Sequence, residues 1–236
     1  MEDQGIFYGV GVGPGDPELL TLKAVRVLEQ VNAVFVPRAG QEKESLALSI
    51  AARFLRDEAR VVELLFPMTR DREQLEASWD EAARQVRQLL DRGESAAFLT
   101  VGDPMLYSTY IYIFKRITAW GYPVETVPGI PSVCVAAAAA GFPLAEGDET
   151  MTLVPWNRNS RPDPGWLQSL NSLALLKVSS DVDGIIDSLK EAGFLQESVL
   201  VTRCGHQDER IETDLASLKG MPVNYFSLIL ARKEKL

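Results

Sequence analysis

The chain has 236 residues, 46% of them hydrophobic, so it is long enough for one or two domains with buried cores and too apolar to be disordered. Its net charge of −9 at pH 7 argues against a nucleic-acid-binding protein, whose surface is usually basic, although a local basic pocket stays compatible with it. Two cysteines without a C-x-x-C pair and a single histidine argue against a metal centre and predict reduced thiols in a cytoplasmic protein.

Strands and helices alternate along the first half of the chain, and glycines and prolines separate them. The predicted strands are 6–12, 33–36, 61–65, 95–101 and 124–127. The first predicted helix has Asp16 as its N-cap and Pro17 at its first position. Further helices are predicted at 44–57, 71–90 and 108–119. This alternation predicts an α/β fold with a mostly parallel sheet.

The second half of the chain has a different pattern of predicted elements. A helix of small residues is predicted at 131–140, a loop at 157–165, and strands at 152–154, 173–178, 199–204 and 225–231. We therefore predict two domains: an N-terminal α/β domain over 1–124 with a mostly parallel sheet, and a C-terminal α/β domain over 125–236 with a mixed sheet.

The N-terminus shows no basic region followed by an apolar stretch, so we expect no signal peptide. The longest apolar run, 133–140, is far shorter than the roughly 20 residues that span a bilayer. We therefore expect a cytoplasmic protein without membrane or nucleic-acid partners.

A cluster of glycines lies at the end of the first predicted strand. A G-x-G-x-x-G dinucleotide fingerprint fails in both registers, because Pro14 and Asp16 occupy its last position. No Gly-Lys-Ser/Thr occurs, so a Walker A loop is absent as well. What remains is a turn whose glycines allow close approach of a ligand, or a tight turn without a ligand.

Three motifs at predicted strand ends carry a resemblance. They are Gly13-Pro14-Gly15-Asp16, Gly102-Asp103-Pro104 and Pro128-Gly129-Ile130-Pro131-Ser132. In this order they resemble the tetrapyrrole methyltransferase superfamily, also called class III methyltransferases, over essentially the whole chain. The resemblance implies two α/β domains with a cofactor cleft between them, S-adenosylmethionine as cofactor, and a homodimer.

Within that superfamily the chain is most similar to the branch that methylates C20 of precorrin-2 or cobalt-factor II in cobalamin biosynthesis. This similarity rests on the opening segment 8–24, on Phe66-Pro67-Met68 and on the closing segment 225–230. The sequence leaves open whether the macrocycle already carries cobalt.

The resemblance also implies which residues bind the cofactor. They are Pro14, Gly102, Asp103, Leu106, Pro131 and Ser132. Gly102 lacks a side chain, so a ligand could lie against its backbone, and Asp103 could accept a hydrogen bond from the cofactor's ammonium group. Asp103 could equally be a turn residue, Leu106 a core residue and Ser132 a helix N-cap.

The implied substrate is a flat macrocycle with many carboxylates, which requires local cations. We expect Arg38, Lys177 and Arg203 to bind it, although surface ion pairs explain the two arginines as well. Lys177 is the most informative, because a lysine within the apolar strand 173–178 is costly unless its charge is paired. The lone His206 is more typical of a structural or solvated residue.

No catalytic residue is assigned, because an activated sulfonium and an electron-rich carbon need mainly positioning and desolvation. Two alternatives stay open. One is another member of the superfamily that acts on uroporphyrinogen III, diphthine or ribosomal RNA, of which the acidic pI disfavours RNA. The other is a non-catalytic tetrapyrrole-binding protein, which the intact glycine motifs disfavour.

Overall fold

The computed structural model describes residues 4–39, 45–67 and 69–233, and divides the chain into two compact units, Met1–Pro131 and Ser132–Leu236. The boundary lies later than the expected position between residues 124 and 125. The reason is that β5 (Val124–Val127) pairs with β1 (Phe7–Gly11) and so belongs to the first unit.

The first unit contains a five-stranded sheet of order β3-β2-β4-β1-β5. Its other strands are β2 (Ala33–Ala39), β3 (Arg60–Phe66) and β4 (Ala96–Thr100). Every strand pairing in this sheet is parallel, in agreement with the α/β class expected from the alternating pattern.

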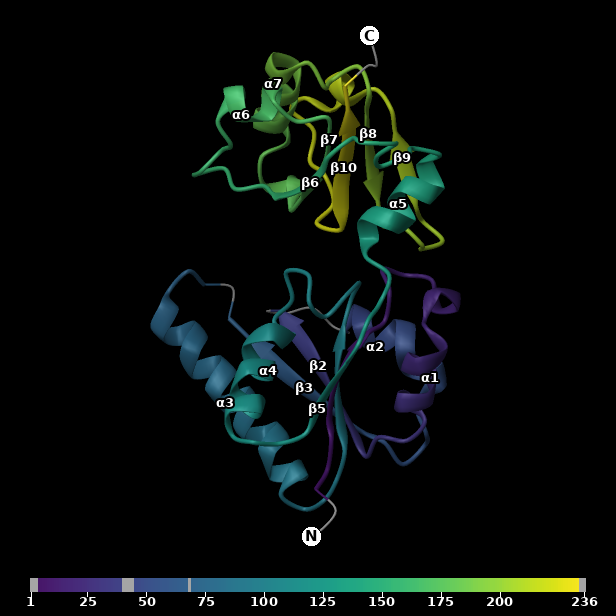
Figure 1. Ribbon diagram of the computed structural model, residues 1–236, viewed down its shortest axis with the longest axis vertical. Coiled ribbons are helices and arrows are strands. Elements are labelled where there is room, and N and C mark those ends of the chain that lie inside the picture. Colours follow the sequence, from purple (N-terminus) through teal and green to yellow (C-terminus); the bar gives the residue numbers. More distant parts are fainter. Residues whose placement is uncertain (1–3, 40–44, 68, 234–236) are drawn as a thin grey trace. The chain divides into compact units, whose positions relative to one another are not determined.

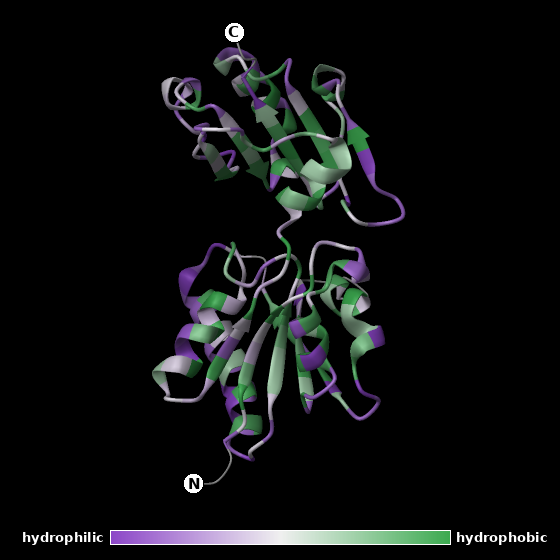
Figure 2. Ribbon diagram, turned by 45° about the vertical axis from the view of Figure 1, so that its right-hand side comes forward, coloured by the Kyte–Doolittle hydropathy of each residue, from purple (hydrophilic) through white to green (hydrophobic). Residues whose placement is uncertain are grey.

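Helices cover both faces of this sheet (Figure 1). The helices α1 (Leu22–Leu28) and α2 (Leu46–Ala51) lie on one side, and α3 (Arg72–Leu90) and α4 (Tyr110–Ala119) on the other. Side chains alternate between the two faces with the period of two that a strand imposes. Phe7 and Phe98 pack in the core beneath α3 and α4, whereas Val10 and Leu99 pack beneath α1 and α2. Figure 2 shows the strands mostly in green between helices with purple outer faces.

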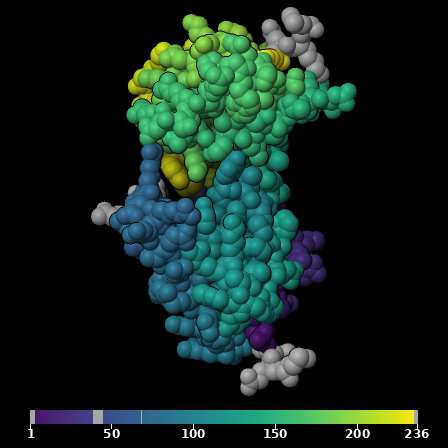
Figure 3. All heavy atoms as spheres, turned by 60° about the vertical axis from the view of Figure 1, so that its left-hand side comes forward, coloured from purple at the N-terminus to yellow at the C-terminus, as the bar shows by residue number. Residues whose placement is uncertain are grey.

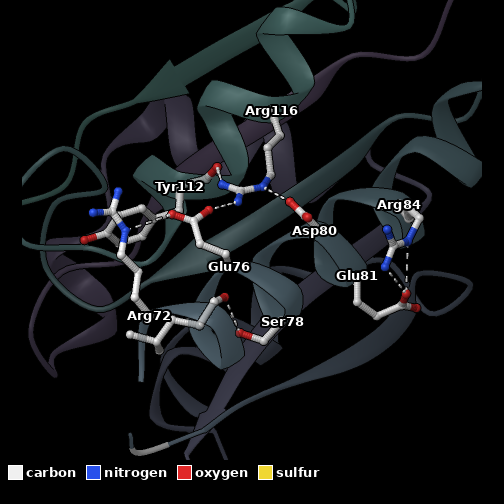
Figure 4. A network of polar contacts seen from close by, with 9 residues as sticks. Arg72, Glu76, Ser78, Asp80, Glu81, Arg84, Tyr112 and Arg116 are labelled. Carbon is white, nitrogen blue, oxygen red and sulfur yellow. Dashed lines mark hydrogen bonds and ion pairs between the residues drawn. The ribbon is translucent and has the colours of Figure 1, made fainter. Parts of the chain in front are cut away.

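The helices α3 and α4 are joined by one polar and aromatic network (Figure 4). Arg116 of α4 donates to Asp80 and to Glu76 of α3, each over 2.5 Å. The Tyr112 ring stacks on the Trp79 ring with centroids 3.7 Å apart. These contacts fix the helix pair whose residues form the blue and teal surface of the first unit in Figure 3.

The chain between β1 and β2 differs from its prediction. Asp16 caps a one-turn 3₁₀ helix, Pro17–Leu19, and Thr21 caps the true helix α1. The expected N-cap at Asp16 and the expected place of Pro17 are confirmed, but the expectation of one continuous helix is wrong, because Thr21 caps a second helix soon after. The helix predicted at 44–57 is shorter: α2 is followed by a 3₁₀ turn, Ala52–Phe54. Residue 44 lies outside the described residues.

The second unit contains a mixed five-stranded sheet of order β6-β7-β10-β8-β9. Its strands are β6 (Met151–Pro155), β7 (Ser172–Leu176), β8 (Ser198–Thr202), β9 (Arg210–Glu212) and β10 (Ser227–Arg232). Strands β6 and β7 are parallel, and β10 runs antiparallel to both β7 and β8. It follows that β6, β7 and β8 all end at the same edge.

Helices cover both faces of the second sheet as well. The helix α5 (Ser132–Ala140) packs on one face, and α6 (Pro164–Gln168) and α7 (Val182–Ala192) lie on the other (Figure 1). The one-turn 3₁₀ helices Val178–Ser180 and Leu215–Leu218 complete this unit. Neither α7 nor β9 was predicted from the sequence. Within the described ranges, the helices are all too short or too polar to cross a membrane.

Candidate functional site

The first sheet has a topological switch point between β1 and β4. The chain leaves β1 toward α1 on one face of the sheet and leaves the neighbouring β4 toward α4 on the other. In open α/β sheets, ligands bind at the carboxyl ends of the strands at such a point. We call the segments 12–16, 101–109 and 128–131, which follow β1, β4 and β5, the first carboxyl edge.

Two loops of this edge are hydrogen-bonded to each other. The Val12 N–H donates to the Thr100 carbonyl over 2.9 Å, and the Gly102 N–H donates to the Gly13 carbonyl over 2.8 Å. Gly13 and Gly102 have φ angles of +73° and +76°, a region that favours glycine. The structure thus brings the Gly-Pro-Gly-Asp and Gly-Asp-Pro motifs together.

The third loop packs against the other two without side chains between them. A Cβ on Gly129 would lie 2.1 Å from the Gly102 carbonyl oxygen, and a Cβ on Gly11 would lie 2.5 Å from the Gly129 Cα. Gly11 and Gly129 are therefore required by contact between loops. The sequence marked Gly129 only as part of the third motif and gave neither glycine a packing role, because the contact depends on which loops are neighbours.

Asp103 ties the second loop to the third. One carboxylate oxygen accepts from the Met105 N–H over 2.8 Å, and the other accepts from the Gly129 N–H over 3.0 Å. Asp103 therefore has the turn role that the sequence left open as an alternative to cofactor binding. Each oxygen has a further lone pair, so a ligand donor can still bind to it.

Hydrogen bonds among buried and half-buried hydroxyl groups hold the loop after β4 in place. The Thr100 and Ser108 hydroxyls lie 3.2 Å apart, and Ser108 also accepts from the Tyr110 N–H over 3.0 Å. The Tyr110 hydroxyl lies 2.8 Å from that of Thr126, and burial raises the pKa of Tyr110. Gly9 is required here, because a Cβ would lie 2.1 Å from the Tyr110 ring. The loop after β4 is thus anchored on a rigid base.

The same loop exposes apolar side chains. Met105 and Tyr107 are 47% and 50% exposed, and Leu106 is half-buried. Tyr107 has a φ of +52°, unusual for a bulky residue and often found at functional sites. This loop can therefore offer apolar surface to a ligand.

The remaining expected cofactor residues lie on both sides of the unit boundary. Pro14 is buried in the loop after β1, and Pro131 is the half-buried last residue of the first unit. Ser132 is the first residue of α5, so it lies inside the helix and not at the N-cap position. Its carbonyl accepts from the Cys204 thiol over 3.7 Å.

Cations lie at the ends of the parallel strands of the second sheet. We call the segments 156–163, 177–181 and 203–209, which follow β6, β7 and β8, the second carboxyl edge. Lys177 directly follows β7 and Arg203 directly follows β8. Both have left-handed backbones, with φ of +61° and +52°. They and Tyr107 are the only non-glycine residues with positive φ in the part of the chain that the structure describes.

Lys177 does not lie within a strand, contrary to the expectation from its apolar neighbours. The strand ends at Leu176, and the left-handed conformation of Lys177 turns its side chain out to an exposed position. It is therefore no buried cation within a strand, although it still lies at the edge where a ligand would bind.

Arg203 lies at a cavity of about 350 Å³. Its Nε donates to Asp208 over 2.7 Å, so it forms the ion pair that was the alternative to substrate binding. Thr202, Arg210 and Asn224 also line this cavity. His206 lies in the same loop, and its N–H donates to the Arg203 carbonyl over 3.0 Å.

Arg38 lies within β2 and not after it, because β2 extends to Ala39. Its Nη1 donates to Glu63 of the neighbouring β3 over 2.6 Å. This cross-strand pair is the surface ion pair that the sequence left open for Arg38.

The comparisons with known proteins identify the family. The profile of the tetrapyrrole (corrin/porphyrin) methylases matches residues 7–219. The chain belongs to this family. The expected resemblance and the expected methyltransferase class are both confirmed.

Two curated proteins are similar to this chain over most of its length. A probable cobalt-precorrin-2 C(20)-methyltransferase of Methanocaldococcus jannaschii is 38% identical over 204 residues, 82% of this chain and 86% of the relative. The cobalt-precorrin-2 C(20)-methyltransferase of Salmonella typhimurium is 32% identical over 233 residues, 98% of this chain and 97% of the relative.

Solved structures confirm the fold. A cobalt precorrin-4 methyltransferase superposes with a TM-score of 0.77 at 23% identity, over 96% of this chain and 94% of the other. A uroporphyrin-III C-methyltransferase from Thermus thermophilus, complexed with S-adenosylhomocysteine, superposes with a TM-score of 0.69 at 24% identity, over 97% of each chain.

Proposed function

We propose that this tetrapyrrole methylase transfers a methyl group from S-adenosylmethionine to C20 of a precorrin-2-type macrocycle in cobalamin biosynthesis, with cobalt-precorrin-2 as the first candidate. The hydrogen bond between Gly102 and Gly13 carries the assignment, because it joins two glycine motifs at a switch point. Two relatives that span most of the chain are named for cobalt-precorrin-2, which supports the metallated substrate.

The first carboxyl edge fits the cofactor. Gly13 and Gly102 present backbone without side chains, and a Cβ on Gly13 would meet nothing closer than 3.7 Å. Asp103 provides an acceptor for an ammonium group, and Leu106 provides apolar contact. Pro14, Pro131 and Ser132 are the further proposed cofactor residues. When bound, S-adenosylmethionine supplies a methyl group that its sulfonium already activates.

The second carboxyl edge supports substrate binding. Lys177 and Arg203 are cations held in a backbone region that is costly for their residue types, and such outliers cluster at functional sites. We assign both to the carboxylates of the macrocycle, together with Arg38. The chain's task is to orient the macrocycle and exclude water, since the methyl donor needs no further activation.

A homodimer in the cytoplasm completes the proposal. Exposed aromatic side chains on or beside α4, Tyr112 and Trp120, are each 40% exposed and are candidates for coverage by a second copy. Sedimentation equilibrium at micromolar concentration is expected to give twice the chain mass. A monomer mass would contradict this part of the proposal.

One experiment tests the activity. The protein is incubated with S-adenosylmethionine and, separately, with cobalt-precorrin-2, precorrin-2 and uroporphyrinogen III, and each product is analysed by mass and methyl position. We expect one added methyl at C20 of the cobalt-containing substrate. Methylation of uroporphyrinogen III would reassign the chain within its family. Tight macrocycle binding without S-adenosylhomocysteine formation would indicate a non-catalytic binding protein.

A further inference from the structure

A buried carboxylate holds two arginines at the second carboxyl edge. The Asp181 side chain, directly before α7, is only 3% exposed. It accepts from the Trp156 indole over 3.0 Å and from Arg161 through both Nε and Nη2, each over 3.0 Å. Arg158 adds a longer contact of 3.4 Å from its Nε. We call these four residues the Asp181 cluster.

The cluster is tied to the strand end that carries Lys177. The Trp156 N–H donates to the Leu176 carbonyl over 2.8 Å, so the segment that follows β6 lies beside the segment that follows β7. Lys177 is the next residue after Leu176 and is exposed. The two arginines and Lys177 therefore lie in neighbouring segments of the second carboxyl edge.

The first turn of α7 is shaped to admit Arg161. A Cβ on Gly184 would lie 2.3 Å from the Arg161 Nη2 and 2.5 Å from an Asp181 carboxylate oxygen. A glycine within a helix costs about 1 kcal/mol relative to alanine. Gly184 therefore makes the helix less stable than alanine would, at the position where the Arg161 guanidinium group lies against the helix.

The cluster contains two arginines, one more than is needed to neutralise its single carboxylate. One carboxylate is matched by one bidentate arginine, and Arg161 already provides this. Burial alone would raise the pKa of Asp181, but hydrogen bonds from Trp156 and Arg161 outweigh burial and lower it. Asp181 is therefore ionised, and the second arginine leaves one positive charge in excess. The Arg158 and Arg161 side chains stay 66% and 46% exposed, so both can reach a ligand.

We propose that Arg158 and Arg161 form a binding site for carboxylate groups at the rim of the macrocyclic substrate, and that Asp181 is the positioning residue that orients them. The inference rests on the proposed function, because it requires a polycarboxylate substrate. A guanidinium group binds a carboxylate through two parallel hydrogen bonds, and a guanidinium held in place loses less side-chain entropy when it does so.

The test begins with Arg158→Met, because its 3.4 Å contact with Asp181 is the weakest in the cluster and its loss should leave the fold intact. The matched control is Lys190→Met, which removes the same charge from an exposed residue at the other end of α7. Uroporphyrin III serves as a binding probe, followed by tryptophan fluorescence quenching, and cobalt-precorrin-2 serves as substrate.

For Arg158→Met we expect the Kd for uroporphyrin III and the KM for cobalt-precorrin-2 to rise about tenfold, or about 1.4 kcal/mol. We expect kcat, S-adenosylhomocysteine affinity and Tm to stay unchanged, and Lys190→Met to behave as wild type. Arg158→Lys, which keeps the charge without the planar fork, should recover only part of the loss.

Asp181→Asn tests the positioning role. We expect it to raise KM as much as Arg158→Met does, although both arginines are still present. A purely structural Asp181 would lower Tm and leave the KM of the folded enzyme unchanged. Wild-type-like Kd and KM in folded Arg158→Met would overturn the inference. Failure of the wild type to bind uroporphyrin III or to methylate any tetrapyrrole would instead overturn the proposed function.

Discussion

The Gly102 N–H donates to the carbonyl oxygen of Gly13 over 2.8 Å, which joins the loops that follow β1 and β4. These residues are far apart in the sequence, and both have left-handed backbones. The two glycine motifs therefore hold each other in place. A substitution in one motif is expected to affect the other, so stability and cofactor affinity have to be measured together.

The first prediction concerns Gly102. Its φ of +76° means that Gly102→Ala should lower the free energy of unfolding by about 1–2 kcal/mol through backbone strain alone. Gly102→Val should cost more, because a β-branched residue tolerates this region less. If the cofactor lies on this backbone, both variants should also lose S-adenosylhomocysteine affinity, measured by calorimetric titration.

Gly121→Ala is the matched control for that prediction. Gly121 has a φ of +83°, and a Cβ there would meet nothing within 4 Å, so the variant carries the same strain in a turn after α4. We expect a similar drop in Tm and wild-type binding of S-adenosylhomocysteine. Full binding by folded Gly102→Val would show that the cofactor does not contact this residue.

The second prediction separates strain from crowding. Gly129→Ala should destabilise the first unit more than Gly121→Ala does, because its Cβ would lie 2.1 Å from the Gly102 carbonyl oxygen and a backbone segment has to move. Overpacking of this kind costs about 1–3 kcal/mol. Thermal melts of the two variants decide it, and equal Tm values would argue against the tight packing of the loops.

The sequence predicted the first sheet well and the second unit less well. Strand ends marked by glycine and proline placed the three motifs at one edge, since parallel strands end together. The loop-to-loop contacts of Gly11 and Gly129 could not be predicted, because they depend on which strands are neighbours. The Asp181 cluster was missed for the same reason: its carboxylate and its arginines come from different segments.

Lys177 shows a different limit of sequence reasoning. Its apolar neighbours indicated a strand interior, but the strand ends one residue earlier and the lysine turns outward. Hydrophobic periodicity locates an element more reliably than its last residue. Lys177 still lies at the edge where a ligand would bind, but as an exposed residue after the strand and not as a buried cation within it.

The third prediction concerns the two thiols. Burial raises the pKa of Cys204 to about 11, and nearby Glu209 adds to the effect, so Cys204 has little thiolate at pH 8. Cys134 is exposed. We expect a disulfide-exchange reagent to modify one thiol rapidly in the native protein and the second only in guanidinium chloride. Rapid modification of both thiols in the native state would contradict the burial of Cys204.

The fourth prediction is a pH dependence. The pKa of Asp181 is lower in the folded than in the unfolded state, so its ionisation stabilises the fold above the unfolded value of about 4. This contribution is lost as the pH falls through the folded pKa. Wild type should therefore exceed Asp181→Asn in stability most near neutral pH, with the difference shrinking in acid. Denaturant titrations between about pH 7 and pH 3, which extend from full ionisation of Asp181 to below its unfolded pKa, would measure this difference. A difference that stays constant over this range would contradict the prediction.

The last prediction uses the left-handed backbone of Lys177. Lys177→Gly removes the side chain and relieves the strain of a φ of +61°, so we expect Tm to rise by an amount equivalent to about 1 kcal/mol. Lys177→Met keeps the strain and removes only the charge, so its Tm should match the wild type. In both variants the KM for the tetrapyrrole should rise, by a factor equivalent to about 1.5–3 kcal/mol of binding free energy if a hydrogen bond to a charged group is lost.

Together, Lys177→Gly and Lys177→Met show whether Lys177 takes part in substrate binding. A lysine retained for its charge at the expense of backbone strain should give a glycine variant that is more stable and binds substrate less well, with S-adenosylhomocysteine affinity unchanged. If Lys177→Gly gains stability while both variants keep the wild-type KM, the strained lysine has no part in substrate binding. Arg203 and the Asp181 cluster would then be the remaining cations of that edge for the macrocycle.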